Sequence, residues 1–378
     1  NPLKAISIVC FVSEVLSSNE HAQYTQFFIA QFFPIIQFPP PYNLVLSYGM
    51  IQYIKLFGKV GDKFPEDQIS AVFNRLAELA LTSGLTQPEM EIENDIETDM
   101  ASMIDSFLNK MGSKVLVPPE IIIQFLQTSK EQLVSAAGTL IQNLGDNKQA
   151  VFDNCLGQLQ GLLQANSQNA VEIMPTVLLF IKSVKYTEGT LNLAQVQAFL
   201  TTCIGICNSD DKLFSLFIRT VYSCLGQHGS DIIFQCIDFL TVGYKSACGI
   251  CDAAEYLLQF EQLPKDWIGP VIDKLSEPIF AAFQSVDTWD LQKDAEQQDI
   301  MALMRSFIHL FASSLKFFQF INPQTYGVMK EFIKMSLNSH FDIPELVESI
   351  LDFIAQMLQH DPEPVFAEFS NGALNILM

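Results

Sequence analysis

The fold class is clearest at residues 342–359, which read DIPELVESILDFIAQMLQ. Asp342 suits an N-cap position, and Pro344 suits the first turn of a helix, where a missing N–H costs nothing. Apolar residues then recur every three or four positions, as on one buried face of a helix with 3.6 residues per turn. The members of this stripe are Leu346, Ile350, Ile354 and Met357, with Val347, Leu351 and Leu358 widening it.

The same pattern extends along most of the chain, and no clear alternation of apolar and polar residues predicts a strand. After residues 129–144, Gly145 supplies a helix stop, and Asn147 is placed to cap the next helix. We therefore expect an all-α protein. Its other predicted helices lie near 3–18, 22–37, 42–58, 66–83, 95–112, 119–128, 129–144, 169–186, 192–207, 210–226, 230–244, 265–284, 295–319 and 322–338.

The links between the predicted helices are short, as at 145–147, 208–211 and 229–231. Consecutive helices on short links pack antiparallel. One such pair takes about 40 residues, the period of HEAT-type repeats. We thus expect residues 1–378 to form one curved superhelical solenoid of HEAT-type antiparallel helix pairs, without an internal domain boundary. Because the chain begins with Asn1, we also expect it to be a fragment of a longer protein.

Composition excludes several classes of protein. Hydrophobic residues make up 49% of the 378 residues and charged residues 17%, so the chain can bury a core and is not intrinsically disordered. The 42 acidic and 21 basic residues give a net charge of −21, which repels nucleic-acid phosphates and attracts basic partners. We expect a basic protein partner and no direct binding of nucleic acid.

Residues 84–99 depart from the helical pattern and are expected to form an acidic loop. Their carboxylates alternate with uncharged residues, so that no single helix face collects them. Two interpretations stay open: an ordinary solvated run of charge, or a contact for a basic partner. The candidate contact residues are Glu89, Glu91, Glu93, Asp95, Glu97 and Asp99.

Two uncharged stretches raise the question of a membrane span. Prolines and glutamines interrupt residues 21–54, and polar side chains interrupt residues 189–209, so we expect no membrane-spanning helix in either. The eight cysteines lie mostly in apolar runs, which is typical of reduced, buried thiols in an intracellular protein. The sequence contains no Asn-x-Ser/Thr site, which also favours the cytosol or nucleus.

The sequence carries no convincing motif for catalysis. The five histidines are far apart, and none shares a local pattern with a candidate nucleophile. Cys248 and Cys251 form a C-x-x-C pair, but no βαβ unit or second pair of metal ligands accompanies them. We interpret them as buried helical thiols. We therefore expect no enzyme activity, no cofactor and no metal site, and binding along an extended surface instead.

The sequences of several predicted helices resemble those of a known family. Residues 2–16, PLKAISIVCFVSEVL, are similar to a helix of nuclear transport receptors of the importin-β superfamily. Residues 32–39, FFPIIQFP, and then residues 45–60 follow in the order seen in its transportin-SR and importin-thirteen branch. Residues 128–163 and 210–284 also look like helix pairs of that branch. The resemblance covers most of the chain and rests on helix order and apolar spacing.

The resemblance implies the middle and C-terminal part of a receptor that carries protein cargo through nuclear pores under control of the Ran GTPase. Such a receptor shuttles between cytoplasm and nucleus and contacts the Phe-Gly repeats of the pore. Because Ran is gripped mainly by N-terminal repeats in this superfamily, the main Ran site is expected outside this chain. Two alternatives stay open: a HEAT-repeat scaffold subunit without transport function, and an exportin for transfer RNA.

The resemblance also singles out Arg219. In the transportin-SR subtype, the helix that matches 210–226 carries a row of arginines that reads phosphorylated Arg-Ser cargo. Here only Arg219 falls on such a position, and Leu213, Leu216 and Ser223 stand where further arginines would be expected. We therefore take Arg219 as a candidate partner contact. The missing arginines count against recognition of phosphorylated Arg-Ser cargo without deciding it, and the net charge of −21 favours basic cargo.

Overall fold

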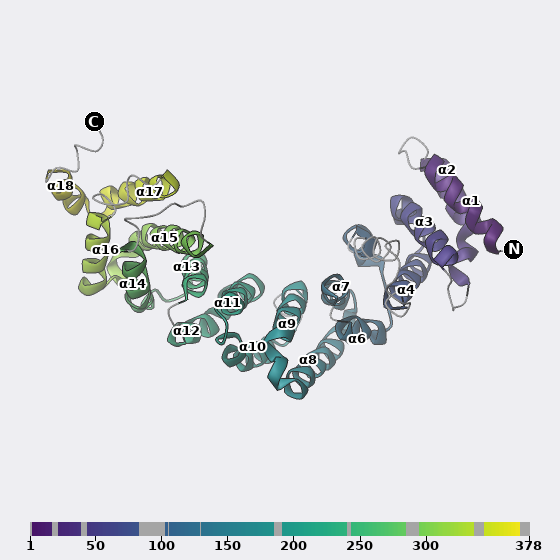
Figure 1. The fold of residues 1–378 in the computed structure, drawn as a ribbon, viewed down its shortest axis with the longest axis horizontal. Helices are drawn as coiled ribbons and strands as arrows, with labels where there is room; N and C mark the ends of the chain where they lie inside the picture. Colours follow the sequence, from purple (N-terminus) through teal and green to yellow (C-terminus); the bar gives the residue numbers. More distant parts are fainter. Residues whose placement is uncertain are drawn as a thin grey trace. The chain divides into compact units, whose positions relative to one another are not determined.

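Helices are the only regular secondary structure that the computed structural model assigns in its described residues, which confirms the all-α prediction for these parts of the chain (Figure 1). The chain divides into two compact units: Asn1–Asn169 with Thr176–Asn192, and Ala170–Pro175 with Leu193–Met378. The expectation of one continuous repeat array over residues 1–378 stays a prediction. The described residues are 2–16, 22–38, 44–82, 103–104, 106–128, 130–184, 191–239, 243–284, 295–335 and 344–370.

The helices of the first unit begin and end within a few residues of the predicted positions. Of the predicted helix at 95–112, residues 106–111 are described and helical. Asn147 does occupy the N-cap position of its helix, but its side chain makes no capping hydrogen bond. The helices are α1 (Pro2–Val15), α2 (Ala22–Phe32), α3 (Leu44–Val60), α4 (Glu66–Thr82), α6 (Pro119–Gln127), α7 (Glu131–Ile141), α8 (Lys148–Ala165) and the part of α9 (Ala170–Val184) that begins at Thr176.

Aromatic side chains fill part of the core of the first unit. Phe57 on α3 stacks on Phe107 with ring centroids 6.1 Å apart, and Phe107 also contacts Phe73 on α4 at 5.6 Å. The buried hydroxyl of Tyr53 donates a hydrogen bond of 3.0 Å to the carbonyl oxygen of Ile29, and burial raises the pKa of this phenol. These contacts join α2, α3, α4 and the helical residues 106–111.

A glycine sets the distance between α7 and α9 in the first unit. A Cβ atom on Gly138 would lie 2.5 Å from the Cβ atom of Ser183 and 2.9 Å from its carbonyl carbon. Ser183 also lies close to Ser135, with 3.2 Å between the two hydroxyl oxygens. The backbones therefore approach so closely here that any larger residue must push the two helices apart.

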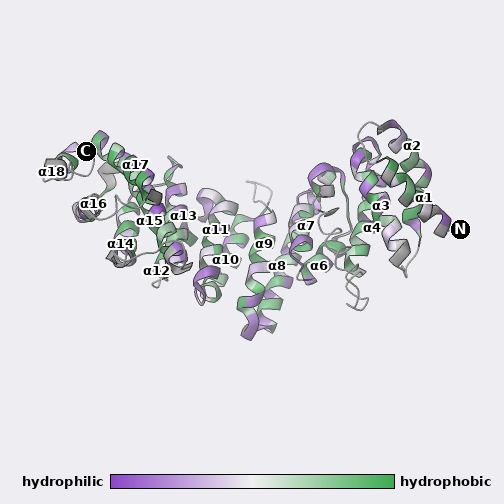
Figure 2. Cartoon of the chain, turned by 45° about the horizontal axis from the view of Figure 1, so that its top comes forward, coloured by the Kyte–Doolittle hydropathy of each residue, from purple (hydrophilic) through white to green (hydrophobic). Residues whose placement is uncertain are grey.

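The second unit is built as two layers of helices. Its helices are α10 (Leu193–Cys207), α11 (Asp211–Leu225), α12 (Ser230–Asp238), α13 (Tyr244–Leu258), α14 (Ile268–Gln284), α15 (Ala295–Ser314), α16 (Pro323–Met335), α17 (Pro344–His360) and α18 (Pro362–Ser370). In one layer α11, α13, α15 and α17 pack in succession, and the even-numbered helices cover them from the other side. Figure 2 shows hydrophobic and hydrophilic residues on different sides of these helices.

Helix α13 falls in a gap between the predicted helices 230–244 and 265–284, and it lies at the centre of the first layer. The predicted helix 230–244 is therefore too long, since α12 ends at Asp238. The buried residues of α13 are mostly small: Ser246, Ala247, Cys248, Gly249, Cys251, Ala253 and Ala254. Small side chains let α11 and α15 pack closely on both flanks, and they weaken the apolar signal that identifies a helix in the sequence.

Two neighbouring aspartates stabilise the starts of α11 and α13. The side chain of Asp210 is the N-cap of α11 and accepts a hydrogen bond of 2.7 Å from the backbone N–H of Leu213. Asp211 acts between helices: its carboxylate accepts from the backbone N–H groups of Lys245 at 3.1 Å and Ser246 at 2.9 Å. It also accepts a hydrogen bond from the Ser246 hydroxyl. The sequence therefore places the cap of α13 on α11.

The other end of α13 is closed by a buried lysine. Lys265 is 4% exposed, and its ammonium group donates to the carbonyl oxygen of Phe260 at 2.7 Å. It also lies 3.3 Å and 3.4 Å from the carbonyl oxygens of Leu258 and Leu257, where α13 ends. Burial lowers the pKa of Lys265. A cation here meets the negative end of the helix dipole and carbonyl groups that have no partner within the helix.

Helix α17 confirms the periodic stripe from which the fold class was predicted, with one difference. Its four main members are buried, as expected: Leu346, Ile350, Ile354 and Met357. The expectation that Leu351 and Leu358 widen the buried face is wrong, because they are 47% and 39% exposed. The proposed cap Asp342 lies outside the described residues. The buried stripe is thus narrower than the apolar pattern of the sequence.

One helical stretch in the described part of the chain, Gln298–Phe317, is long and apolar enough to cross a membrane by length and composition alone. Within the unit, 61% of this stretch is buried. It coincides largely with α15, which packs between α13 and α17.

Candidate functional site

The predicted contact residues fall into two groups with respect to the structure. Arg219 is described and lies on α11, with its side chain 52% exposed. The acidic segment lies outside the described residues, so the structure says nothing of its six carboxylates: Glu89, Glu91, Glu93, Asp95, Glu97 and Asp99. The candidate site is therefore built around Arg219.

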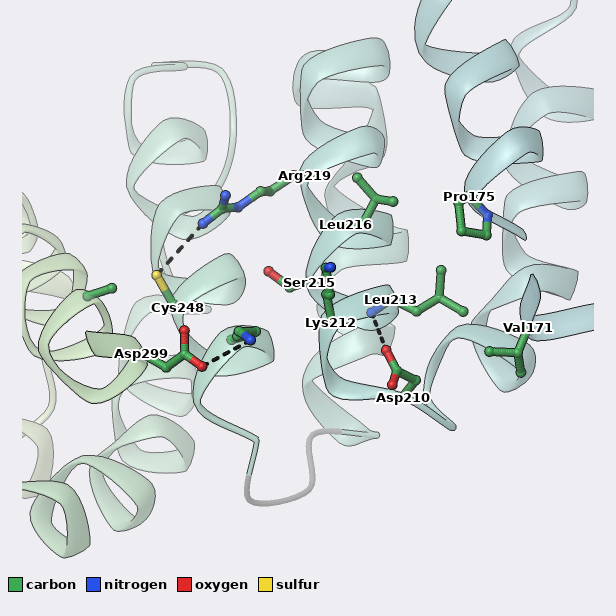
Figure 3. A pocket seen from close by; sticks show the side chains of 12 residues that line it. Val171, Pro175, Asp210, Lys212, Leu213, Ser215, Leu216, Arg219, Cys248 and Asp299 are labelled. Atoms are coloured by element: carbon green, nitrogen blue, oxygen red, sulfur yellow. Dashed lines mark hydrogen bonds and ion pairs between the residues drawn. The ribbon is translucent and has the colours of Figure 1, made fainter. Parts of the chain in front are cut away.

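Arg219 lines an open pocket of about 660 Å³ in the second unit, which we call the α11 pocket. Four helices supply its walls: the start of α9, then α11, α13 and α15 (Figure 3). It is lined by Val171, Pro175, Asp210, Lys212, Leu213, Ser215, Leu216, Arg219, Lys245, Cys248, Asp299 and Ala302.

The exposed face of α11 follows the helical period. Lys212, Leu216, Arg219 and Ser223 are all exposed and lie at positions i, i+4, i+7 and i+11. Leu213 is buried, at 5% exposed. Lys212 therefore lies on the same face as Arg219, whereas Leu213, the position where the family resemblance expects an arginine, does not. This face carries two basic residues where the resemblance alone indicated one.

One side of the α11 pocket is apolar. In Figure 3, Leu213 and Leu216 lie on the side of α11 that faces Val171 and Pro175 at the start of α9. Leu216 and Val171 are 39% and 40% exposed, which is high for aliphatic side chains. Water therefore covers apolar surface here, and an apolar side chain from a partner would displace it favourably.

The other side of the α11 pocket is charged. Arg219 forms an ion pair of 3.3 Å with Asp252, and Lys245 forms one of 3.0 Å with Asp299. The hydrogen bond that the Lys245 ammonium donates to the Asp299 carboxylate raises the pKa of Lys245. Among the described residues Lys212 makes no ion pair, and its side chain is exposed. The paired charges are largely solvated, so a partner can exchange its own charged groups for them at low cost.

Cys248 borders the charged side of the pocket as a buried thiol. Its sulfur lies 3.9 Å from a guanidinium nitrogen of Arg219 (Figure 3). The Ser306 hydroxyl lies 3.3 Å from the same sulfur. The thiol is only 5% exposed, and burial raises its pKa. A nucleophilic cysteine needs the opposite, a lowered pKa and access. The geometry therefore favours a binding surface over covalent chemistry.

The cysteines whose side chains are described, Cys248 among them, confirm the prediction of reduced, buried thiols. Seven are free and buried: Cys155, Cys203, Cys207, Cys224, Cys236, Cys248 and Cys251. Burial raises the pKa of Cys203 to about 11 and that of Cys155 and Cys236 to about 12. Within the described ranges, no group of three or more His, Cys, Asp or Glu side chains could hold a metal ion.

Sequence reasoning found Arg219 and missed most of its surroundings. Lys245 and Asp299 come from helices that follow α11 at long sequence distance, and one of these helices was not predicted. The signal that was present is the row Lys212, Leu216 and Arg219 on one helix face, since an exposed leucine between two basic residues departs from an ordinary solvated face.

No family model, no curated protein and no solved structure matches this chain.

Proposed function

We propose that this chain is the cargo-binding part of a nuclear transport receptor, built as a solenoid of HEAT-type antiparallel helix pairs. The layered packing of α11, α13, α15 and α17 supports the repeat architecture, because each of these helices packs on the next one of its layer. The family resemblance of residues 2–16, 32–39, 45–60, 128–163 and 210–284 supports the transport role. In this proposal the protein moves between cytoplasm and nucleus.

The observation that carries the binding role is the α11 pocket. It combines exposed apolar side chains with charged groups held in place by ion pairs, which is the composition of a surface that anchors a protein segment. Leu216 would receive an apolar side chain of the cargo, and Lys212 would meet a carboxylate next to it. The net charge of −21 would favour cargo that is basic elsewhere on its surface.

Binding to Phe-Gly repeats distinguishes a transport receptor from a scaffold. The purified chain is passed over beads that carry a Phe-Gly repeat polypeptide and, as a matched control, over beads that carry the same polypeptide with Ser in place of Phe. A receptor is retained on the Phe-Gly beads only. Equal passage through both would favour the scaffold alternative.

Hydrolysis-deficient Ran loaded with GTP should bind this chain weakly, and tight binding would show that the placement within the family is wrong.

The role of the pocket is tested by substitution. Leu216→Asp places a charge on the apolar side, and Ser223→Asp adds the same charge on the same exposed face outside the pocket. Proteins captured from cytosol by the unsubstituted chain are quantified by mass spectrometry for both variants. We expect Leu216→Asp to reduce cargo capture at least fivefold and Ser223→Asp to leave it within twofold, with Phe-Gly retention unchanged in both. Equal capture by both variants would contradict the assignment of this pocket.

A further inference from the structure

A second pocket of about 540 Å³ lies on the opposite layer of the second unit, and we call it the α12 pocket. Helix α12, the connection that follows α13 and the start of α14 form its walls. None of its lining residues is basic. They are Ser230, Asp231, Phe234, Ile237, Asp238, Leu263, Pro264, Asp266, Trp267, Pro270 and Val271.

The apolar part of the α12 pocket is centred on two aromatic rings. Phe234 and Trp267 lie with ring centroids 5.4 Å apart and planes inclined by 38°. The indole N–H of Trp267 is buried and has no hydrogen-bond acceptor among the described residues. A buried donor without an acceptor is unfavourable, and a peptide carbonyl is an acceptor that a bound segment brings with it.

Three carboxylates surround these rings. Asp231, Asp238 and Asp266 are all exposed, and none of them forms an ion pair or hydrogen bond within the described part of the chain. Asp231 and Asp238 lie two turns apart on one face of α12. Asp238 is the last residue of that helix, where the helix dipole disfavours negative charge. The pocket therefore holds three carboxylates that no ion pair within the described residues neutralises, although the helix dipole favours Asp231 in the first turn of α12.

The lysine that is adjacent in sequence to Asp266 does not form an ion pair with these carboxylates. Lys265 precedes Asp266, but it is buried and its ammonium group is bound to the carbonyl oxygens at the end of α13. The cation that would complement the α12 pocket is thus missing from its walls, while the aromatic faces that favour a cation are present.

We propose that the α12 pocket binds an arginine side chain from an exposed basic segment of a protein partner. The guanidinium group is planar, stacks on aromatic rings and forms paired hydrogen bonds with carboxylates, so it suits Phe234 and Trp267 flanked by aspartates better than an ammonium group does. The inference requires only that a basic segment reaches α12. It does not rest on the transport role or on the α11 pocket.

The chain offers a selective reporter for this proposal. It contains two tryptophans, so Trp289→Phe leaves Trp267 as the only one. The probe is the acetylated and amidated peptide Gly-Arg-Gly-Arg-Gly, and its control carries citrulline, which has the shape of arginine without its charge. We expect the arginine peptide to change Trp267 fluorescence saturably, with an affinity that falls as salt is added, and the citrulline peptide to bind at least tenfold more weakly.

Two triple variants with the same net charge locate the site. Asp231, Asp238 and Asp266 are changed to Asn in one variant, and the exposed residues Glu120, Glu131 and Asp146 to Gln, Gln and Asn in the other. We expect the first variant to bind the arginine peptide at least tenfold more weakly and the second to stay within twofold of the unsubstituted chain.

Equal losses in both triple variants, or binding without any change in Trp267 fluorescence, would overturn the proposal. If the first triple variant loses helical circular dichroism, the single change Asp266→Asn decides instead, because this residue lies outside the helices. That variant should weaken binding at least threefold, and unchanged binding would overturn the proposal.

Discussion

Replacing Asp211 by Ala should open the start of α13 rather than the start of α11. The carboxylate of Asp211 accepts from two backbone N–H groups of α13, at 3.1 Å and 2.9 Å, and from the Ser246 hydroxyl. Loss of a capping side chain costs about 1 kcal/mol. Loss of the bond to the buried hydroxyl adds about another 1 kcal/mol, with the backbone carbonyl of Asp211 still available to Ser246 at 3.1 Å. The local stability of α13 should fall by about 2 kcal/mol.

Asp210 is the matched control, because it is the same residue type at the neighbouring position and caps its own helix. Asp210→Ala should cost about 1 kcal/mol and act on α11 alone. Hydrogen exchange separates the two variants. The Asp211→Ala variant should speed exchange of amides 245–248 about 30-fold, since 1.4 kcal/mol is a factor of ten. The Asp210→Ala variant should leave these amides within threefold.

A close contact allows a second perturbation of the same bond. A Cβ atom on Gly243 would lie 2.1 Å from a carboxylate oxygen of Asp211, so Gly243→Ala should displace the carboxylate and reproduce the exchange pattern of Asp211→Ala. Equal acceleration of amides 245–248 by the Asp210 and Asp211 variants, or no acceleration by either Asp211→Ala or Gly243→Ala, would refute the claim that α11 caps α13.

Gly138→Ala should destabilise the first unit by about 1–3 kcal/mol, since the new methyl group meets Ser183; urea midpoints measure this, and an unchanged midpoint would contradict the close approach. Alkaline pH should also destabilise the protein through its buried thiols. Folded Cys155 and Cys236 keep their protons up to a pKa of about 12, whereas unfolded thiols ionise near pH 8.5, so between these values the folded state binds more protons and stability falls as pH rises. The expected loss at pH 10 is about 2 kcal/mol for each thiol, measured by urea titration against a variant with both cysteines changed to Ala.

The helices could be predicted wherever long apolar side chains recur with the helical period. The stripe of α17 is an example. The prediction is wrong there at Leu351 and Leu358, which belong to the apolar pattern and yet are exposed, because the neighbouring helices cover only part of that face. Helix α13 shows the opposite case. Its buried residues are mostly small, so close packing is achieved without the strong apolar signal that a prediction relies on.

The candidate site could be predicted only at one residue. Arg219 was identified from a resemblance in a single helix, but its pocket is assembled from α9, α11, α13 and α15. No local pattern links Lys212 to Asp299, since both line the pocket only because α11 and α15 pack against α13. The α12 pocket was not predicted at all. Its carboxylates are scattered in the sequence. Trp267 lies in a connection between helices, so helical periodicity gives no sign that it packs against Phe234.

The layered order of the second unit also bears on how it folds. Its main packing partners are helices one or two positions apart along the chain, so the two ends of the unit need not meet for most of its contacts to form. Low contact order of this kind is associated with fast folding, because little loop entropy is lost before each contact forms. Because helix α13 is buried on both flanks and held at both ends by Asp211 and Lys265, we expect it to become ordered together with α11 and α15 early in folding. The outermost helix α18 should be the first part of the unit to open.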